Sequence, residues 1–185
     1  MGGIEIAAAM LGVINVLLVV RRSVWNYPFG IAMVSLYFFV FWDAKLYSDA
    51  LLQIFFLLIQ IYGWVAWSRA TEVDHGVAVR WMSRRSQAVW VVATAVGVLI
   101  WGALMARFTD AAAPMADASV AGLSVAAQLL QSFRRVESWV FWVTVDILAI
   151  GVFTWRGLGV TAALYTLFLI LAVVGLVEWR RKAIC

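Results

Sequence analysis

Two tryptophans and one aspartate share a helical face in the second half of the sequence. Trp139, Trp142 and Asp146 stand at positions i, i+3 and i+7, a spacing that places side chains on one side of a helix. Indole rings stack on flat molecules and attract cations, and a carboxylate counters a positive charge. The pattern therefore predicts a binding site for a flat, preferably cationic ligand. The structural alternatives are an interfacial tryptophan belt and an aspartate hydrogen-bonded to a neighbouring helix.

Asp146 lies near the centre of an apolar stretch, residues 138–155, that contains no other charge. An ionisable group there costs about 2.5–3.5 kcal/mol on membrane-insertion scales, so it usually faces a cavity or a partner. Every other charged residue lies in a loop or at the end of an apolar stretch. We therefore expect Asp146 to line a ligand pathway.

Further polar residues inside apolar stretches are secondary candidates for ligand binding. Gln53 and Gln60 stand seven residues apart on one face of residues 48–67, and Tyr165 lies within residues 158–178. The alternative for each is a hydrogen bond that only joins two helices. Other polar residues of this kind are Asn15, Gln128 and Thr144.

No signature of catalysis, cofactor binding or metal binding is present in the sequence. It contains no Walker motif, HExxH motif or nucleophile elbow. The single cysteine, Cys185, is the last residue, and the single histidine, His75, lies in the most polar loop, so we expect no metal site. The net charge of +4 has no accompanying basic patch interleaved with aromatics, which argues against nucleic acid. We expect neither an enzyme nor a bound cofactor.

The composition places these residues in an all-α membrane protein. The 185 residues are 65% hydrophobic and 13% charged, whereas soluble domains carry about 25% charged residues. Because about 20 apolar residues cross the hydrocarbon as a helix, the chain holds seven predicted transmembrane helices. They cover residues 4–20, 25–42, 48–67, 88–106, 118–133, 138–155 and 158–178.

The basic residues orient these seven helices. With seven spans, the connections fall alternately on two sides, and eleven of the 14 basic residues share one side. One side holds Arg21, Arg22, Arg69, Arg80, Arg84, Arg85, Arg134, Arg135, Arg180, Arg181 and Lys182, and the other holds Lys45, Arg107 and Arg156. Since short cytoplasmic loops carry the excess of Lys and Arg, we expect the N-terminus outside and the C-terminus in the cytoplasm.

An internal repeat divides the chain. A shift of 114 residues pairs Trp25 with Trp139, Tyr27 with Phe141 and Phe39 with Phe153, and a shift of 112 pairs Gly63, Trp67 and Arg69 with Gly175, Trp179 and Arg181. We expect a first three-helix repeat in residues 1–69, a cytoplasmic loop and linker helix in 70–110, and a second repeat in 111–185. Parallel repeats of this 3+1+3 order are a transporter design, with the substrate held between the halves. Chance matches in an aromatic-rich chain are the alternative.

Several segments together resemble the PnuC family of bacterial vitamin transporters. They are residues 23–30 (SVWNYPFG), 45–53 (KLYSDALLQ), 61–67 (IYGWVAW) and 137–142 (ESWVFW), the last followed by Asp146 in a Trp-x-x-Trp-x-x-x-Asn/Asp element. The resemblance covers nearly the whole chain. It implies a SWEET-like fold, facilitated diffusion across the bacterial inner membrane, retention of the vitamin by a separate kinase, and a homotrimer.

The resemblance also implies binding roles for Trp139, Trp142 and Asp146, and less directly for Gln53, Gln60 and Tyr165. Nicotinamide riboside is the expected substrate, because its pyridinium ring is a flat cation. Family members for this riboside often have Asn at the position of Asp146, so thiamine, with its cationic thiazolium, stays an alternative. A membrane scaffold or receptor that transports nothing is the alternative from another class.

Overall fold

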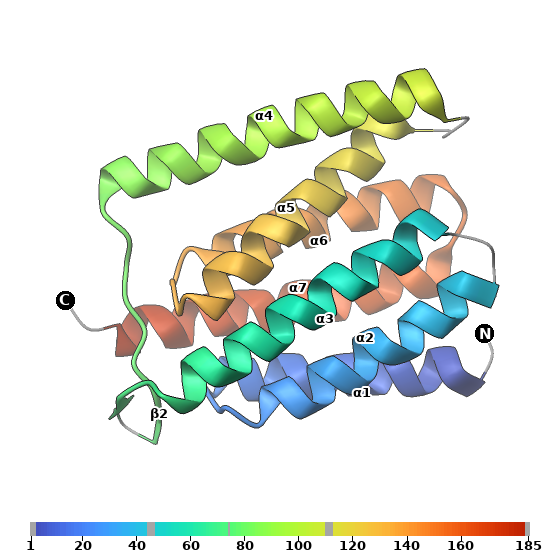
Figure 1. Ribbon diagram of the computed structural model, residues 1–185. Helices are drawn as coiled ribbons and strands as arrows, with labels where there is room; N and C mark the ends of the chain where they lie inside the picture. The colour runs from blue at the N-terminus through green and yellow to red at the C-terminus, as the bar shows by residue number, and fades with distance from the viewer. Residues whose placement is uncertain (1–2, 44–46, 74, 110–112, 184–185) are drawn as a thin grey trace.

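Seven helices and one short hairpin make up the described part of the chain (Figure 1). The computed structural model describes residues 3–43, 47–73, 75–109 and 113–183, so Lys45 and Cys185 lie outside it. The elements are α1 (Gly3–Val20), α2 (Asn26–Asp43), α3 (Tyr47–Ser68), β1 (Glu72–Val73), β2 (Gly76–Val77), α4 (Arg84–Phe108), α5 (Pro114–Ser132), α6 (Ser138–Trp155) and α7 (Gly159–Lys182). The prediction of an all-α protein with seven helices is confirmed.

The helices form two units of three. In the first unit α1 packs against α2 and α2 against α3; in the second α5 packs against α6 and α6 against α7. Among the described residues the units meet chiefly where α1 packs against α7 and α3 against α5. Figure 1 shows α1, α3, α5 and α7 running in one direction and α2, α4 and α6 in the other, so both units run the same way.

The turns that open the second helix of each unit have the same backbone conformation. Arg22 and Arg134 both adopt the left-handed region, with φ of 56° and 58°. The amide of the next residue bonds to an earlier helix carbonyl in both turns, Ser23 to Leu18 and Arg135 to Leu130. All of these equivalent residues are 112 positions apart.

A buried aromatic residue lies over a glycine in each unit. The Tyr27 ring contacts Gly63 and meets Trp67 edge to face at 5.4 Å and 87°. In the second unit the Trp139 ring contacts Gly175 and meets its own neighbour, Trp179, at 5.5 Å and 88°. The shift is again 112.

These equivalences correct the predicted repeat register for α2 and α6. The shift of 114 pairs Trp25 with Trp139, but Trp25 is 70% exposed whereas Trp139 is 2% exposed. Tyr27, fully buried, occupies the equivalent place instead. The prediction was wrong because it matched residues by aromatic type, whereas the packing matches them by burial.

Hydrogen bonds between the two units follow the same shift. Trp67 Nε1 donates to the carbonyl oxygens of Gln131 (3.3 Å) and Ser132 (3.2 Å) at the end of α5. Trp179 Nε1 donates to the carbonyl oxygen of Val19 (3.0 Å) at the end of α1. Each unit thus supplies a buried indole donor to the other.

The fourth helix packs against α5 and begins earlier than predicted. The sequence predicted a start at residue 88, but α4 begins at Arg84. Ser83 caps it, because its hydroxyl oxygen accepts a bond from the Ser86 amide (3.2 Å). In the first turn, Gln87 Nε2 donates to Glu137 Oε1 (2.7 Å), which ties α4 to the start of α6.

The connection between α3 and α4 is bonded first to one unit and then to the other. The hairpin β1–β2 contacts the first unit, since the Val77 amide donates to the Arg22 carbonyl oxygen (3.1 Å). The Ala78 amide still bonds back to the Thr71 carbonyl oxygen (3.0 Å). The hairpin therefore belongs with α1–α3.

From Arg80 onward the connection bonds to the second unit. The Arg80 amide donates to the Arg134 carbonyl oxygen (3.1 Å), and its own carbonyl oxygen accepts from the Val136 amide (3.2 Å). The Met82 amide donates to Glu137 Oε1 (2.8 Å), and Glu137 is 6% exposed. This part of the connection is fixed to the turn between α5 and α6.

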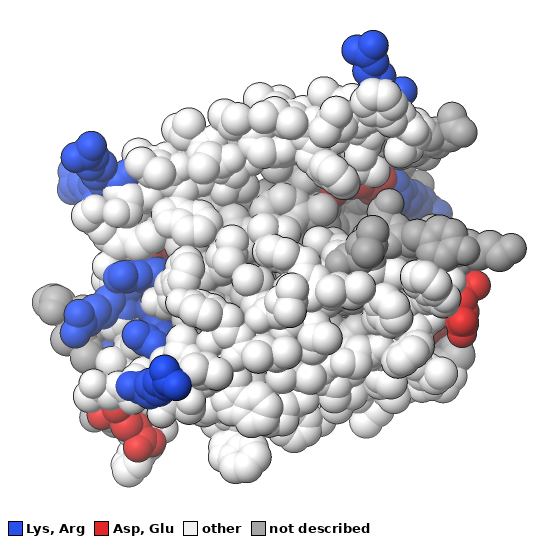
Figure 2. All heavy atoms as spheres, viewed as in Figure 1, with Lys and Arg blue, Asp and Glu red and all other residues white. Residues whose placement is uncertain are grey.

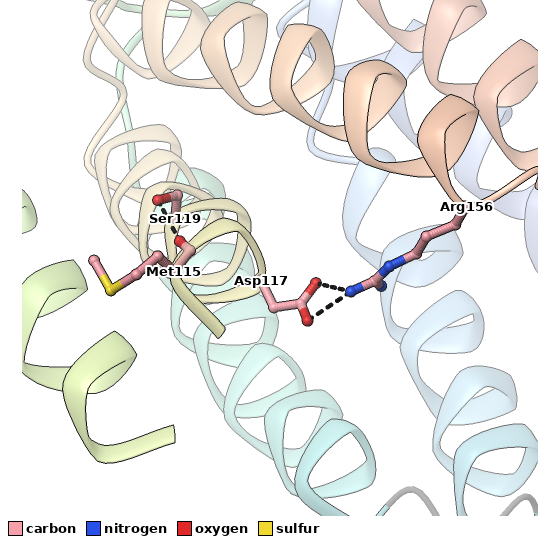
Figure 3. Close-up of polar contacts among 4 residues, drawn as sticks. All are labelled: Met115, Asp117, Ser119 and Arg156. Atoms are coloured by element: carbon pink, nitrogen blue, oxygen red, sulfur yellow. Dashed lines mark hydrogen bonds and ion pairs between the residues drawn. The ribbon is translucent and has the colours of Figure 1, made fainter. Parts of the chain in front are cut away.

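An ion pair joins two helix ends at the opposite end of the bundle (Figure 3). Arg156 follows α6 directly, and Asp117 lies in the first turn of α5. The Nη2 atom of Arg156 donates to both carboxylate oxygens of Asp117, at 2.9 and 2.8 Å. Both side chains are about a third exposed, at 29% and 31%. An exposed pair of this kind contributes at most about 1 kcal/mol.

The surface combines an apolar flank with a basic end. Four helices, α1, α4, α6 and α7, are long and apolar enough to cross a membrane by length and composition. Figure 2 shows uncharged side chains over the flank and most of the Lys and Arg gathered at the end where α1, α3, α5 and α7 finish. Such a surface fits a bilayer around the flank and water at the ends.

The contact between Trp139 and Gly175 predicts the effect of a single methyl group. A Cβ at Gly175 would lie 2.5 Å from the Trp139 ring, so Gly175→Ala should destabilise the protein by about 1–3 kcal/mol through overpacking. Gly151→Ala is the matched control, because a Cβ there meets nothing within 4 Å. Thermal unfolding in detergent measures both; equal melting temperatures for the two variants would contradict the packing described here.

Candidate functional site

Trp139 lies in the first turn of α6 and is enclosed by its own unit. Its ring is 2% exposed and packs between Gly175 and Trp179 of α7. Its Nε1 atom is buried and has no acceptor among the described residues. The indole ring of Trp139 is therefore tightly packed, and its N–H group is a hydrogen-bond donor without a partner among the described residues. Its predicted role in ligand binding stays a prediction.

Trp142 lies one turn deeper along α6 and is only partly buried. Its Nε1 donates to Gln131 Oε1 at 2.9 Å, which fixes the plane of the indole against α5. One turn before Gln131, the Gln128 side chain is 5% exposed, and its Nε2 has no acceptor in the described part of the chain. The hydrogen bond thus orients the ring of Trp142, and the neighbouring helix α5 carries two buried glutamine side chains.

Asp146 follows after one more turn and is 4% exposed. Its carboxyl group makes no hydrogen bond or ion pair with any residue in the described ranges. Tyr165 of α7 lies within electrostatic range of it, and Tyr37 of α2 within range of Tyr165. The Tyr165 ring is held by stacking on Phe153 at 5.2 Å. The structure thus places a buried carboxyl group without a partner near a positioned tyrosine.

Amide side chains of the first unit gather around Gly30. A Cβ at Gly30 would lie 2.5 Å from Gln60 Nε2 and 2.8 Å from Asn15 Nδ2, so only glycine leaves room for both amides. Asn15 Nδ2 donates to the Asn26 carbonyl oxygen at 2.7 Å. Gln60 is 3% exposed, and its Oε1 is buried without a donor among the described residues. Gln53, two turns earlier on α3, is partly buried.

The predicted residues thus form two groups on facing units. Trp139, Trp142 and Asp146 line successive turns of α6, with Tyr165 beside Asp146, and Gln60 lies with Asn15 in the first unit. Sequence reasoning named Asn15 only as a further polar residue and did not name Gln131 as a candidate. The signal of Gln131 was a polar amide within an apolar stretch, the same signal that selected Gln60.

Two cavities of the structure lie away from these residues. One of about 400 Å³ lies between α3, α4 and α5, and one of about 260 Å³ lies beside the turn after α5. None of the six predicted site residues lines either cavity.

Known proteins of similar sequence are transporters. The chain is 27% identical over 205 residues to the nicotinamide riboside transporter PnuC of Escherichia coli, covering 97% of this chain and 86% of that protein. It is 27% identical to the nicotinamide riboside transporter PnuC of Neisseria mucosa (94% and 70% covered) and 25% identical to the riboflavin/roseoflavin transporter RibM of Streptomyces davaonensis (95% and 83%).

A solved structure and a family model agree with these relatives. The crystal structure of the vitamin B3 transporter PnuC matches with a TM-score of 0.80 at 26% identity, covering 97% of this chain and 81% of that one. The model of the family described as the nicotinamide mononucleotide transporter matches residues 2–181. The chain therefore belongs to this family, which is the family of the PnuC transporters.

Proposed function

We propose that this chain carries nicotinamide riboside across the inner membrane by facilitated diffusion. Its family is a family of multi-pass transporters, and two of the relatives above are named for this riboside. The observation that carries the proposal is the Asp146 carboxyl group, buried at mid-helix in α6 without a partner among the described residues. A group that is costly to bury and unpaired is explained by a ligand that pairs with it.

The charges of the helix interiors favour the riboside over the mononucleotide. The mononucleotide differs by a phosphate, which needs Lys, Arg or helix N-termini to replace its hydration. In the described helices, Asp146 is the one Asp, Glu, Lys, Arg or His at mid-helix, and the basic residues lie at the ends. A carboxyl group attracts the pyridinium and repels the phosphate, so the riboside fits.

The remaining predicted residues have complementary roles in this proposal. Trp142 offers a partly buried, oriented ring for stacking on the pyridinium. Trp139 is enclosed by Gly175, so a ligand reaches it only when α6 and α7 separate slightly. Gln60, Gln53 and Tyr165 supply hydrogen bonds to the ribose hydroxyls or the carboxamide.

We extend the proposal to the topology and assembly of the protein. Residues 1–69 and 111–185 act as SWEET-like parallel repeats that alternate access around the site, and residues 70–110 link them. The basic end faces the cytoplasm, so the N-terminus lies outside. Transport is the whole activity, a separate kinase traps the product, and the protein assembles as a homotrimer.

Uptake into proteoliposomes tests the substrate. We expect labelled nicotinamide riboside to equilibrate across the membrane of vesicles that contain the protein. No ion gradient should be needed, because facilitated diffusion is driven by the concentration gradient of the substrate alone. A hundredfold excess of nicotinamide mononucleotide or thiamine should leave the initial rate unchanged. Uptake of thiamine and not of the riboside would identify thiamine as the substrate. Uptake of no vitamin would favour a scaffold or receptor.

Replacement of Asp146 tests its role as counter-charge. We expect Asp146→Ala to raise the Kd for nicotinamide riboside about tenfold to a hundredfold, because a hydrogen bond to a charged group is worth about 1.5–3 kcal/mol. Gln53→Ala should change the Kd far less, and Asp146→Asn should recover part of the loss. Calorimetric titration of the purified protein measures all three. A Kd for Asp146→Ala within twofold of the unsubstituted protein would refute the counter-charge.

A further inference from the structure

The cavity between α3, α4 and α5 lies apart from the predicted substrate site. Its volume of about 400 Å³ is large enough for a small polar headgroup. It lies at the basic end of the bundle, because its lining includes Ser83 at the start of α4 and Arg134 and Arg135 after α5. In Figure 1 α4 stands away from α3, with α5 between them.

One side of this cavity is lined by arginine and serine side chains, groups that can bind a phosphate. The Arg135 side chain has no hydrogen-bond or ion-pair partner in the described part of the chain. Arg134 is already oriented, since its Nη1 donates to the Ala66 carbonyl oxygen at 2.8 Å. Ser83 and Ser86 add hydroxyl groups, 3.0 Å apart, at the N-terminus of α4, where the helix dipole favours an anion.

None of the described residues that line the cavity is acidic. Glu137 lies nearby but is buried and does not line the cavity; its Oε1 accepts bonds from the Met82 amide and Gln87 Nε2. The adjoining cavity of about 260 Å³ shares Arg134 and Arg135 and adds Arg80. Three arginines, Arg80, Arg134 and Arg135, thus line the two adjoining cavities, and no acidic residue is among the described residues that line them.

The other side of the cavity is aromatic and apolar. Phe133 meets Tyr62 of α3 edge to face at 5.9 Å and Trp90 of α4 at 6.4 Å. Beyond these rings, α3 and α4 present exposed apolar side chains on the flank, among them Leu58 and Val89. Aromatic rings between a basic end and an apolar flank are typical of the membrane–water interface.

We infer that this cavity binds the phosphate headgroup of an anionic phospholipid, whose acyl chains lie along α3 and α4. Arginines, serine hydroxyls and the start of α4 would hold the phosphate, as basic pockets between helices do for acidic lipids. The positive charge of a choline headgroup would find no carboxylate among the described residues that line this cavity. The site is separate from the predicted substrate site, since none of its lining residues belongs to that site.

Lipid titration with matched variants tests this inference. The full-length protein in detergent is titrated with phosphatidylglycerol and, separately, with phosphatidylcholine, and the lipid-bound fraction is read by native mass spectrometry. Arg135→Gln should weaken phosphatidylglycerol binding about fivefold, the effect of one basic side chain near an anionic headgroup. Arg69→Gln is the control, because Arg69 is exposed at the same end and lines neither cavity.

A second variant leaves the charge unchanged. Ser86→Leu narrows the cavity and should also weaken phosphatidylglycerol binding, while a preference for phosphatidylglycerol over phosphatidylcholine should be clear in the unsubstituted protein. Equal binding of the two lipids, or equal losses for Arg135→Gln and Arg69→Gln, would overturn the inference. Competition by millimolar inorganic phosphate as strong as that of the lipid would also overturn it, in favour of a site for free phosphate. Nicotinamide riboside uptake is not part of the readout, so the result is independent of the proposed function.

Discussion

Two indole N–H groups, each donating to the end of a helix in the opposite unit, hold the fold together. Trp67 and Trp179 are 1% and 0% exposed, and a buried indole donor without an acceptor would cost about 1–3 kcal/mol. The acceptors are carbonyl groups at the ends of α5 and α1. Each unit supplies the acceptor for the tryptophan of the other, so these bonds fix the units to each other at the basic end.

The two units have equivalent backbones but carry different types of side chain at their centres. At a shift of 112 residues, the equivalent pairs are Asn15 with Ala127, Gly30 with Trp142, Gln60 with Ala172 and Val34 with Asp146. In the first unit a glycine makes room for two amides; in the second, two buried alanines accompany an indole. A ligand bound between them as proposed would meet hydrogen-bonding amides on one side and a ring and a carboxyl group on the other. This asymmetry would distinguish one orientation of the ligand from the orientation obtained by exchanging the two units.

Much of the fold was predictable because length and hydropathy alone identify helices that cross a bilayer. The Arg-Arg pairs also indicated the two equivalent turns. The register could not be read correctly, since Trp25 and Trp139 share a residue type while their burial is opposite. The bond from Trp142 to Gln131 was equally hidden. It crosses a turn whose direction depends on the left-handed conformation of Arg134, and spacing in the sequence does not report that conformation. The helix face that carries Asp146 was predictable because it lies within a single helix.

The connection between α3 and α4 limits how the two units can move. Its hydrogen bonds to the first unit end at Val77, and those to the second begin at Arg80. Ala78 and Val79 lie between, and Val79 is fully buried. Two residues span at most about 7 Å, so we expect the units to act as a hinge with a short tether at this end and a wider swing at the other. Distances between spin labels on the two units, measured at each end of the bundle, would show whether the motion is larger at the far end. Helix α4 follows the first unit in sequence, but we expect it to move together with the second unit.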